Sequence, residues 1–241
     1  MASELQRALA DSAVERDVDR MLRSHGFHPP NPIDIASIPV PNTEVAIKTA
    51  EYTHKELDAT MWNHSNRAYY LGAVVATDQF PDWKVDLDTY YLTALFHDIG
   101  VAPRYHLSTS LSFEFWGGIH AREKLVEFGA SQLQADEVAE AIIRHTDFVP
   151  GQIRKVGQLI QMGTTIDVIG RNPELYHADT IDAIVKKYPR LGFNCHFADL
   201  MDKECLHKPG SHTSAGDEIN FIDRIRNNKV MEKYDNNKSA L

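Results

Sequence analysis

The sequence of 241 residues lacks several features that would place it in a specialised class of protein. It has no run of about 18 apolar residues, which a membrane-spanning helix requires. It has no basic block, and 25 basic against 34 acidic residues give a net charge of −9, which argues against binding to a nucleic-acid backbone. The two cysteines, Cys195 and Cys205, are too few for a secreted disulfide framework. We therefore expect no membrane or nucleic-acid partner and a reducing compartment.

The N-terminal segment, residues 2–24, carries no export signal. Its apolar residues Leu5, Leu9 and Met21 are interspersed with charged ones, whereas a secretory peptide needs an uninterrupted apolar stretch. Its acidic residues also argue against a mitochondrial presequence, which is poor in acids. We therefore expect a cytoplasmic or nuclear protein.

What is present is the composition of an ordinary globular protein, with 43% hydrophobic and 24% charged residues. Residues 28–43 contain five of the eleven prolines, which predicts an extended arm. This arm either wraps the following domain or joins a short N-terminal helix to it. The predicted organisation is a helix and proline-rich arm over residues 1–43, followed by one helical domain over residues 44–241.

Helical periodicity dominates the chain after the arm. No stretch combines sustained alternation with β-branched residues, so strands are not expected and the predicted fold class is all-α. Gly129 closes one helix, and Ser131 with Gln134 predicts a capping box for the next. The expected helices span residues 44–60, 61–79, 86–97, 112–128, 132–146, 153–169, 178–187, 193–205 and 217–233.

Ionisable residues fall on the apolar stripes of four of these helices. His64, Asp98, His145 and Asp167 each continue a series of apolar residues at helical spacing, and His97 directly precedes Asp98. A lone histidine on such a stripe is usually a hydrogen-bonded core residue. A buried aspartate costs several kcal/mol unless it is ion-paired, for which a distant Lys or Arg would serve, or binds a metal. Two imidazoles and two carboxylates that converge would suit a divalent first-row metal.

Residues 94–100 read Ala-Leu-Phe-His-Asp-Ile-Gly and resemble the signature of the HD-domain metal-dependent hydrolase superfamily. That superfamily uses a His…His-Asp…Asp pattern on a bundle of helices. The resemblance implies that residues 44–241 form an HD-type catalytic domain. It also implies metal ligands at the four positions that match the pattern, which are His64, His97, Asp98 and Asp167.

Over most of residues 40–215 the chain also resembles one fungal branch of that superfamily, the cyanamide hydratases (urea hydro-lyases). The segments that carry this resemblance are residues 63–65, 94–100, 112–119, 139–145, 157–161, 189–190 and 208–213. Val101 and Gly210 depart from the branch, which tends to have threonine and tryptophan there. The resemblance implies hydration of cyanamide, or of a similarly small nitrile-like molecule, to urea. It also implies zinc as the metal, with iron or manganese as alternatives, and self-association into a homo-oligomer.

In this interpretation a metal-bound hydroxide attacks the nitrile carbon, because a metal ion can lower the pKa of its bound water from roughly 15.7 to about 7. Asp98 or Asp167 would also accept the proton of that water. The charge that develops on nitrogen needs a proton donor; His145 is the first candidate, and Glu114 and His212 are weaker ones. Each donor has a structural alternative: a supporting hydrogen bond for His145, helix N-terminal charge placement for Glu114, and a surface loop for His212.

Two other functions stay open. An HD-type phosphohydrolase acting on a nucleotide is the first, although Val101 stands where single-metal nucleotidases often carry glutamate. Phosphates attract Arg and Lys clamps, and near the motif only Arg104 is obvious. The second is a metal-stabilised binding or regulatory module without turnover. A cavity for about three or four heavy atoms would favour a small nitrile, and a long cleft would favour a nucleotide.

Overall fold

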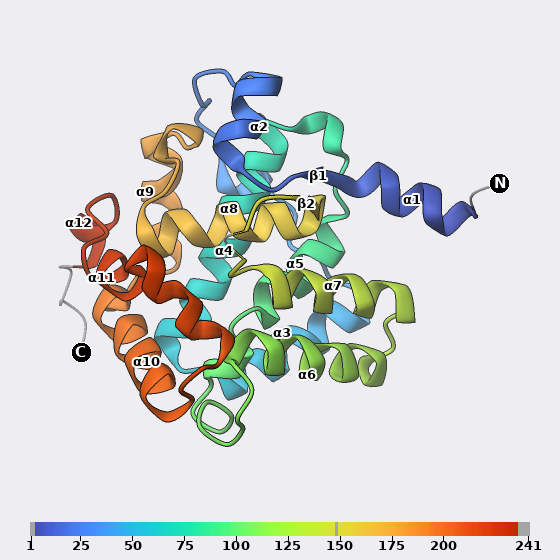
Figure 1. Ribbon diagram of the computed structural model, residues 1–241. Helices are drawn as coiled ribbons and strands as arrows, with labels where there is room; N and C mark the ends of the chain where they lie inside the picture. Colours follow the sequence, from blue (N-terminus) through green and yellow to red (C-terminus); the bar gives the residue numbers. More distant parts are fainter. Residues whose placement is uncertain (1–2, 148, 236–241) are drawn as a thin grey trace.

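The computed structural model describes residues 3–147 and 149–235, and within them α-helices dominate, which confirms the all-α prediction (Figure 1). The helices are α1 (Glu4–Ser12), α2 (Val18–His25), α3 (Glu44–Glu56), α4 (Ala59–Asp78), α5 (Leu87–Phe96), α6 (Phe113–Phe128), α7 (Gln132–Arg144), α8 (Lys155–Ile169), α9 (Ala178–Lys187), α10 (Phe193–His207), α11 (Phe221–Arg226) and α12 (Glu232–Asp235). Among the described helices, none combines the length and the apolar character that crossing a bilayer requires. The predicted division into residues 1–43 and 44–241 stays a prediction, and residues 1–2, 148 and 236–241 lie outside the described residues.

Helices α3 to α10 follow the predicted spans because local signals fix their ends. The Asp86 side chain accepts from the Asp88 N–H at the start of α5, and the Ser131 side chain accepts from the Gln134 N–H at the start of α7. Gly129 ends α6 with φ 103°, a left-handed conformation that favours glycine.

Two predictions of secondary structure are wrong. The chain does contain strands: β1 (Ala13–Glu15) and β2 (Gln152–Arg154) form a short antiparallel pair. The single closing helix predicted over residues 217–233 is instead broken into a 3-10 helix (His212–Ile219), α11 and α12. Asn220 interrupts it with φ 52°, a left-handed conformation that asparagine tolerates better than most residues.

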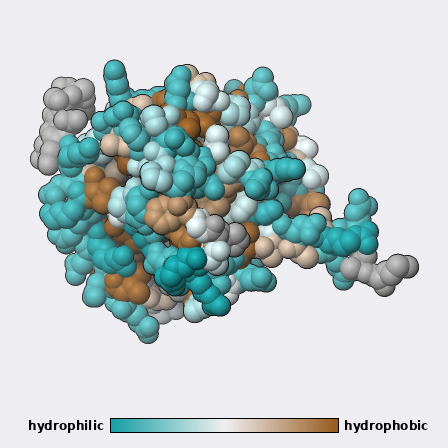
Figure 2. All heavy atoms as spheres, turned by 90° about the horizontal axis from the view of Figure 1, so that it is seen from above, coloured by the Kyte–Doolittle hydropathy of each residue, from teal (hydrophilic) through white to brown (hydrophobic). Residues whose placement is uncertain are grey.

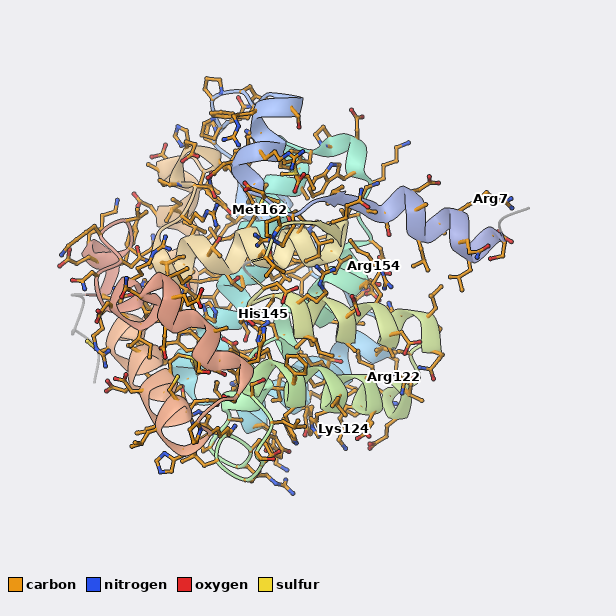
Figure 3. All side chains as sticks on the ribbon, viewed as in Figure 1. Arg7, Arg122, Lys124, His145, Arg154 and Met162 are labelled. Atoms are coloured by element: carbon orange, nitrogen blue, oxygen red, sulfur yellow. The ribbon has the colours of Figure 1, made fainter. Side chains whose placement is uncertain are left out.

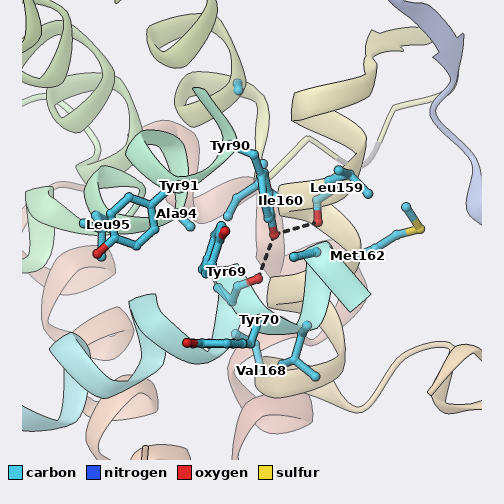
Figure 4. Packing of buried hydrophobic residues seen from close by; sticks show 14 of the residues in the cluster. Tyr69, Tyr70, Tyr90, Tyr91, Ala94, Leu95, Leu159, Ile160, Met162 and Val168 are labelled. Atoms are coloured by element: carbon cyan, nitrogen blue, oxygen red, sulfur yellow. Dashed lines mark hydrogen bonds between the residues drawn. The ribbon is translucent and has the colours of Figure 1, made fainter. Parts of the chain in front are cut away.

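The core lies where α4, α5 and α8 cross. Tyr90 of α5 is fully buried, and its hydroxyl donates to the Ala68 carbonyl of α4 at 2.7 Å and lies 3.4 Å from the Leu159 carbonyl of α8 (Figure 4). Gly72 and Gly163 make this approach possible, because a Cβ at either position would lie 3.0 Å or less from the Tyr90 hydroxyl. The close crossing fixes the two helices that carry His64 and Asp167.

The remaining helices surround this crossing. α6 and α7 form an antiparallel pair on one side, while α10, α11 and α12 lie on the other (Figure 1). The proline-rich arm wraps the domain, since the Ile33 N–H donates to Thr180 of α9 and the Tyr69 hydroxyl of α4 donates to the Pro39 carbonyl. α1 projects away from the body (Figure 1), and apolar residues on the face seen in Figure 2 are scattered in small groups among hydrophilic ones.

Candidate metal centre

Three of the four predicted ligands converge in the core. His64 lies in the middle of α4, and His97 and Asp98 directly follow α5; all three are essentially inaccessible to solvent. The Nε2 atoms of His64 and His97 are 3.1 Å apart, and they lie 3.4 and 3.1 Å from Asp98 Oδ2. One donor atom from each of the three residues thus lies within 4.8 Å of the other two, close enough to bind one metal ion.

His145, predicted as a proton donor, belongs to the same cluster. It follows α7 directly and lies near α8 and α11 (Figure 3). Its Nε2 is 3.6 Å from Asp98 Oδ1, the carboxylate oxygen that does not face the other two imidazoles. Asp98 therefore has three imidazole Nε2 atoms around it.

Each imidazole is oriented by its other nitrogen. His97 Nδ1 donates to the Ala94 carbonyl at 2.8 Å, and His145 Nδ1 donates to the Ile142 carbonyl at 2.6 Å. A carbonyl can only accept, so in the neutral rings the proton is on Nδ1 and Nε2 carries a lone pair. His64 Nδ1 donates in the same way to Asp167, at 2.7 Å. In the neutral rings, the three Nε2 lone pairs therefore point at one carboxylate. Metal-bound histidines are commonly held in this way, by a hydrogen bond from the other ring nitrogen to a carbonyl or carboxylate oxygen.

The electrostatics of the cluster favour a cation. Burial lowers the pKa of His64 to about 4 against the opposing effect of Asp167, so this ring is neutral near pH 7. Burial also acts to lower the pKa of His97, but the charge of Asp98 outweighs it and the pKa is raised. Burial would raise the pKa of Asp98, yet the charge of the neighbouring His97 holds it well below its ordinary value. An ionised carboxylate is thus buried beside imidazole nitrogens that can bind a cation.

The donor set fits a divalent transition metal. Both oxygens of Asp98 are buried without a hydrogen-bond partner in the part of the chain that the structure describes, and such a carboxylate is costly unless a cation balances it. Four donors at about 2.0–2.2 Å from a tetrahedral zinc ion lie roughly 3.3 Å from one another. The separations of 3.1 to 3.4 Å among His64 Nε2, His97 Nε2 and Asp98 Oδ2 match that spacing, while His145 Nε2 faces the other oxygen, Oδ1, at 3.6 Å.

Asp167, the fourth predicted ligand, has different partners. Besides His64, its carboxylate accepts from Arg67 Nη2 at 2.8 Å and from Arg190 Nη1. Both arginines are fully buried. Burial would raise the pKa of Asp167, but Arg190 and Arg67 hold it well below its ordinary value. The carboxylate is thus ion-paired on the side of His64 that faces away from Asp98.

A small apolar cavity of about 30 Å³ adjoins the cluster. Its walls include Phe113, Val168, Phe197 and Phe221, with His64, His97, Asp98 and His145 at one side. The hydroxyl of Thr146, which also lines the cavity, is buried without a hydrogen-bond partner among the described residues. Pockets for drug-sized ligands have roughly 300 Å³ or more, so this cavity suits a molecule of a few heavy atoms.

Glu114 and His212, the weaker predicted candidates, form a pair of their own. Glu114 is buried in the first turn of α6, and its Oε1 accepts from His212 Nδ1 at 2.6 Å. This hydrogen bond raises the pKa of His212 above its ordinary value. Neither residue lines the small cavity, although Phe113 beside Glu114 does.

The sequence-based interpretation missed the residues that support the ligands. Arg67 follows His64 by three residues, a spacing that places both on one face of α4, and this was the available signal. Arg190 reaches Asp167 from a loop; residues 189–190 belong to the segments that carry the family resemblance, but their spacing does not indicate this contact. Two residues depart from the pattern of the cyanamide hydratases. Val101 is buried but does not line the cavity, and Gly210 lies in a turn with φ 77°. Arg104 faces Glu56 at 3.6 Å and does not line the cavity.

Comparisons with known proteins agree with this geometry. A family model described as the HD domain matches residues 61–203. Two cyanamide hydratases of Saccharomyces cerevisiae, DDI2 and DDI3, are each 42% identical to the chain over 187 residues, which cover 76% of this chain and 83% of each relative. The predicted resemblance is thereby confirmed.

Proposed function

Because the chain belongs to the HD-domain family, we propose that it is a hydro-lyase that adds water to cyanamide, or to a similarly small nitrile-like molecule, with the help of a divalent metal. One observation carries this proposal: the buried His and Asp cluster opens onto an apolar cavity of only about 30 Å³. The names of the two yeast relatives support the choice of cyanamide. A nucleotide is too large for this cavity.

We assign the metal to His64, His97, Asp98 and His145, with zinc as the metal that suits three imidazoles and one carboxylate. When bound, the metal supplies a Lewis acid that makes water nucleophilic near neutral pH. Because His145 Nδ1 donates to the Ile142 carbonyl, Nε2 carries a lone pair in the neutral ring and faces Asp98, so we assign His145 as a ligand rather than as a proton donor. Asp167 orients His64 through the hydrogen bond to Nδ1.

The protein's own groups then handle the substrate and its protons. Addition of water to N≡C–NH2 bonds oxygen to carbon and transfers both protons to the nitrile nitrogen, which gives urea. Asp98 is the group best placed to take a proton from the attacking water, since neither of its oxygens has a hydrogen-bond partner among the described residues. The Thr146 hydroxyl, buried at the cavity wall, is free to donate to the nitrogen as negative charge develops. The surrounding phenylalanines exclude bulk water, which strengthens these interactions.

The experiment that tests the proposal is incubation of the purified, metallated protein with cyanamide and measurement of urea. We expect urea formation, its loss in His97→Ala, and about one zinc per chain by elemental analysis. A fully metallated sample that forms no urea would overturn the proposal. A His120→Ala variant is the matched control, because His120 lies outside the cluster and bonds Tyr52.

A further inference from the structure

One aromatic residue of the small apolar cavity lies at the edge of the core. Among the described residues three phenylalanines line this cavity; Phe113 and Phe197 are buried, whereas Phe221, the first residue of α11, is half-buried. The ring of Phe221 thus closes the cavity on the side that is nearer to solvent. A change at this position would alter the size of the cavity without opening the centre of the core.

The chain on either side of Phe221 faces a second, larger hollow. That hollow has a volume of about 220 Å³, and its wall includes Ile219, two residues before Phe221, and Arg224, three residues after it. His145 and Thr165 line both hollows. Residues 219–224 therefore belong to the partition between the two, and a molecule that moves from the larger hollow towards the metal centre passes Phe221.

Neighbouring residues hold the Phe221 ring in place. Gly216 is buried in the preceding 3-10 helix, and a Cβ at this position would lie 3.0 Å from Cβ of Phe221 and 3.4 Å from its ring atoms Cγ and Cδ1. On the other side, Ile225 is fully buried and Arg226 pairs with Asp202 of α10. Because the ring is packed on one side and its helix is anchored on the other, it forms a fixed boundary of the cavity.

We propose that Phe221 is a specificity-determining residue whose ring sets the upper limit on the size of the nitrile that reaches the metal centre. This role rests on the proposed function and deepens it, since it restricts the substrate class to unsubstituted cyanamide and molecules of similar size. Protein interiors are close-packed, so a cavity of about 30 Å³ leaves no room for additional methyl groups. Larger nitriles are excluded because the ring occupies the space that their substituents need.

The test compares cyanamide with dimethylcyanamide, whose hydration gives dimethylurea, in the metallated wild type and in Phe221→Ala. We expect the ratio of the two kcat/KM values, cyanamide over dimethylcyanamide, to fall at least about tenfold in the variant. A difference of one methylene group in an apolar pocket is worth roughly 10–200-fold in discrimination. Phe221→Leu is a second variant, for the case that loss of the whole ring unfolds α11, and it should shift the ratio in the same direction.

Phe128→Ala is the matched control. Phe128 is also half-buried, but it packs against Tyr52 at the end of α6 and does not line the small cavity. The ratio in this variant should equal that of the wild type. An unchanged ratio in folded, metallated Phe221→Ala and Phe221→Leu would overturn the proposal.

A binding measurement separates this size limit from the proposed function. Saturation-transfer NMR on the methyl signal of dimethylcyanamide reports whether the larger nitrile enters the metallated protein, independently of turnover. We expect dimethylcyanamide to bind Phe221→Ala at least about tenfold more tightly than it binds the wild type. That result in a protein that forms no urea would refute cyanamide hydration and support the size limit. Equal binding by the wild type and the folded variants would refute the size limit alone.

Discussion

The ring of His64 separates two polar clusters that satisfy their buried groups in different ways. On the pocket side, Asp98 and the Thr146 hydroxyl have no hydrogen-bond partners within the described residues. On the arginine side, Asp167 accepts from His64, Arg67 and Arg190. Both aspartates are buried and both follow apolar helix stripes. In the assignment proposed above, a carboxylate that binds the metal differs from one that only orients a ligand in whether the protein itself supplies its partners.

The energetics explain the division. Removing one partner of a buried ion pair leaves the other charge uncompensated, whereas removing a charge that lacks a partner relieves a cost. The arginine side should therefore stabilise the fold strongly, and the pocket side should contribute less to stability until a cation binds. We therefore expect substitutions on the pocket side to change mainly metal binding, and substitutions on the arginine side to change mainly the free energy of unfolding.

The largest effect is expected from Asp98→Asn on the pocket side. Loss of the carboxylate should abolish stoichiometric metal binding and lower urea formation on the order of 10³-fold or more, since the water is no longer activated. The free energy of unfolding of the metal-free protein should fall less than in Asp167→Asn, because this carboxylate is compensated by His97 and not by two buried arginines. Elemental analysis, the urea assay and denaturation in the presence of a chelator measure these quantities. Retention of one metal per chain would contradict the assignment.

Asp167→Asn on the arginine side should behave in the opposite way. Two buried guanidinium groups lose their acceptor, so the free energy of unfolding of the metal-free protein should fall by about 3–5 kcal/mol. Metal affinity should fall only about 10–100-fold, through the loss of His64 orientation. Guanidinium denaturation and competition with a metal chelator provide the measurements. If the variant is as stable as the wild type without metal but binds no metal, Asp167 is a direct ligand, as the family pattern implies.

The same contrast explains what the sequence could predict. Helices with local caps, such as α5 after Asp86 and α7 after Ser131, were predicted from signals within one turn. The pairing of Val14 with Ile153 was not, because three-residue strands carry little periodicity and their partner is distant in the chain. Helical spacing identified Asp98 and Asp167 as inward-pointing but could not tell them apart. The difference depends on Arg67 and Arg190, which reach Asp167 across long sequence separations.

Thr146→Val tests whether the Thr146 hydroxyl on the pocket side takes part in the reaction. If the hydroxyl donates to the substrate nitrogen, its loss should lower kcat/KM about tenfold, equivalent to roughly 1.4 kcal/mol, with metal content unchanged. Thr146→Ser keeps the hydroxyl and should retain most of the activity. Steady-state kinetics of urea formation measures the effect. Full activity in the valine variant would show that the hydroxyl has no part in the reaction.

The smallest effect is expected at the Glu114–His212 pair, which belongs to neither of the two clusters. Glu114 raises the pKa of His212 in the folded protein above its unfolded value, so folding is favoured by the protonated form. This stabilisation is fully present below the unfolded pKa of about 6.5 and is lost as the pH rises through the folded pKa. Because the His212 side chain is 33% exposed, the contribution should be below about 1 kcal/mol.

The stability difference between the wild type and His212→Gln should therefore be largest near pH 5.5 and should vanish at alkaline pH, as measured by guanidinium denaturation across that range. His207→Gln, whose ring bonds the Lys203 carbonyl instead of a carboxylate, is the control and should show no such trend. Urea formation by His212→Gln should remain within a few-fold of the wild type, because the pair does not line the small cavity. A loss of activity that exceeds the change in stability would instead assign the pair to proton transfer, and would extend the functional side of the molecule beyond the metal ligands.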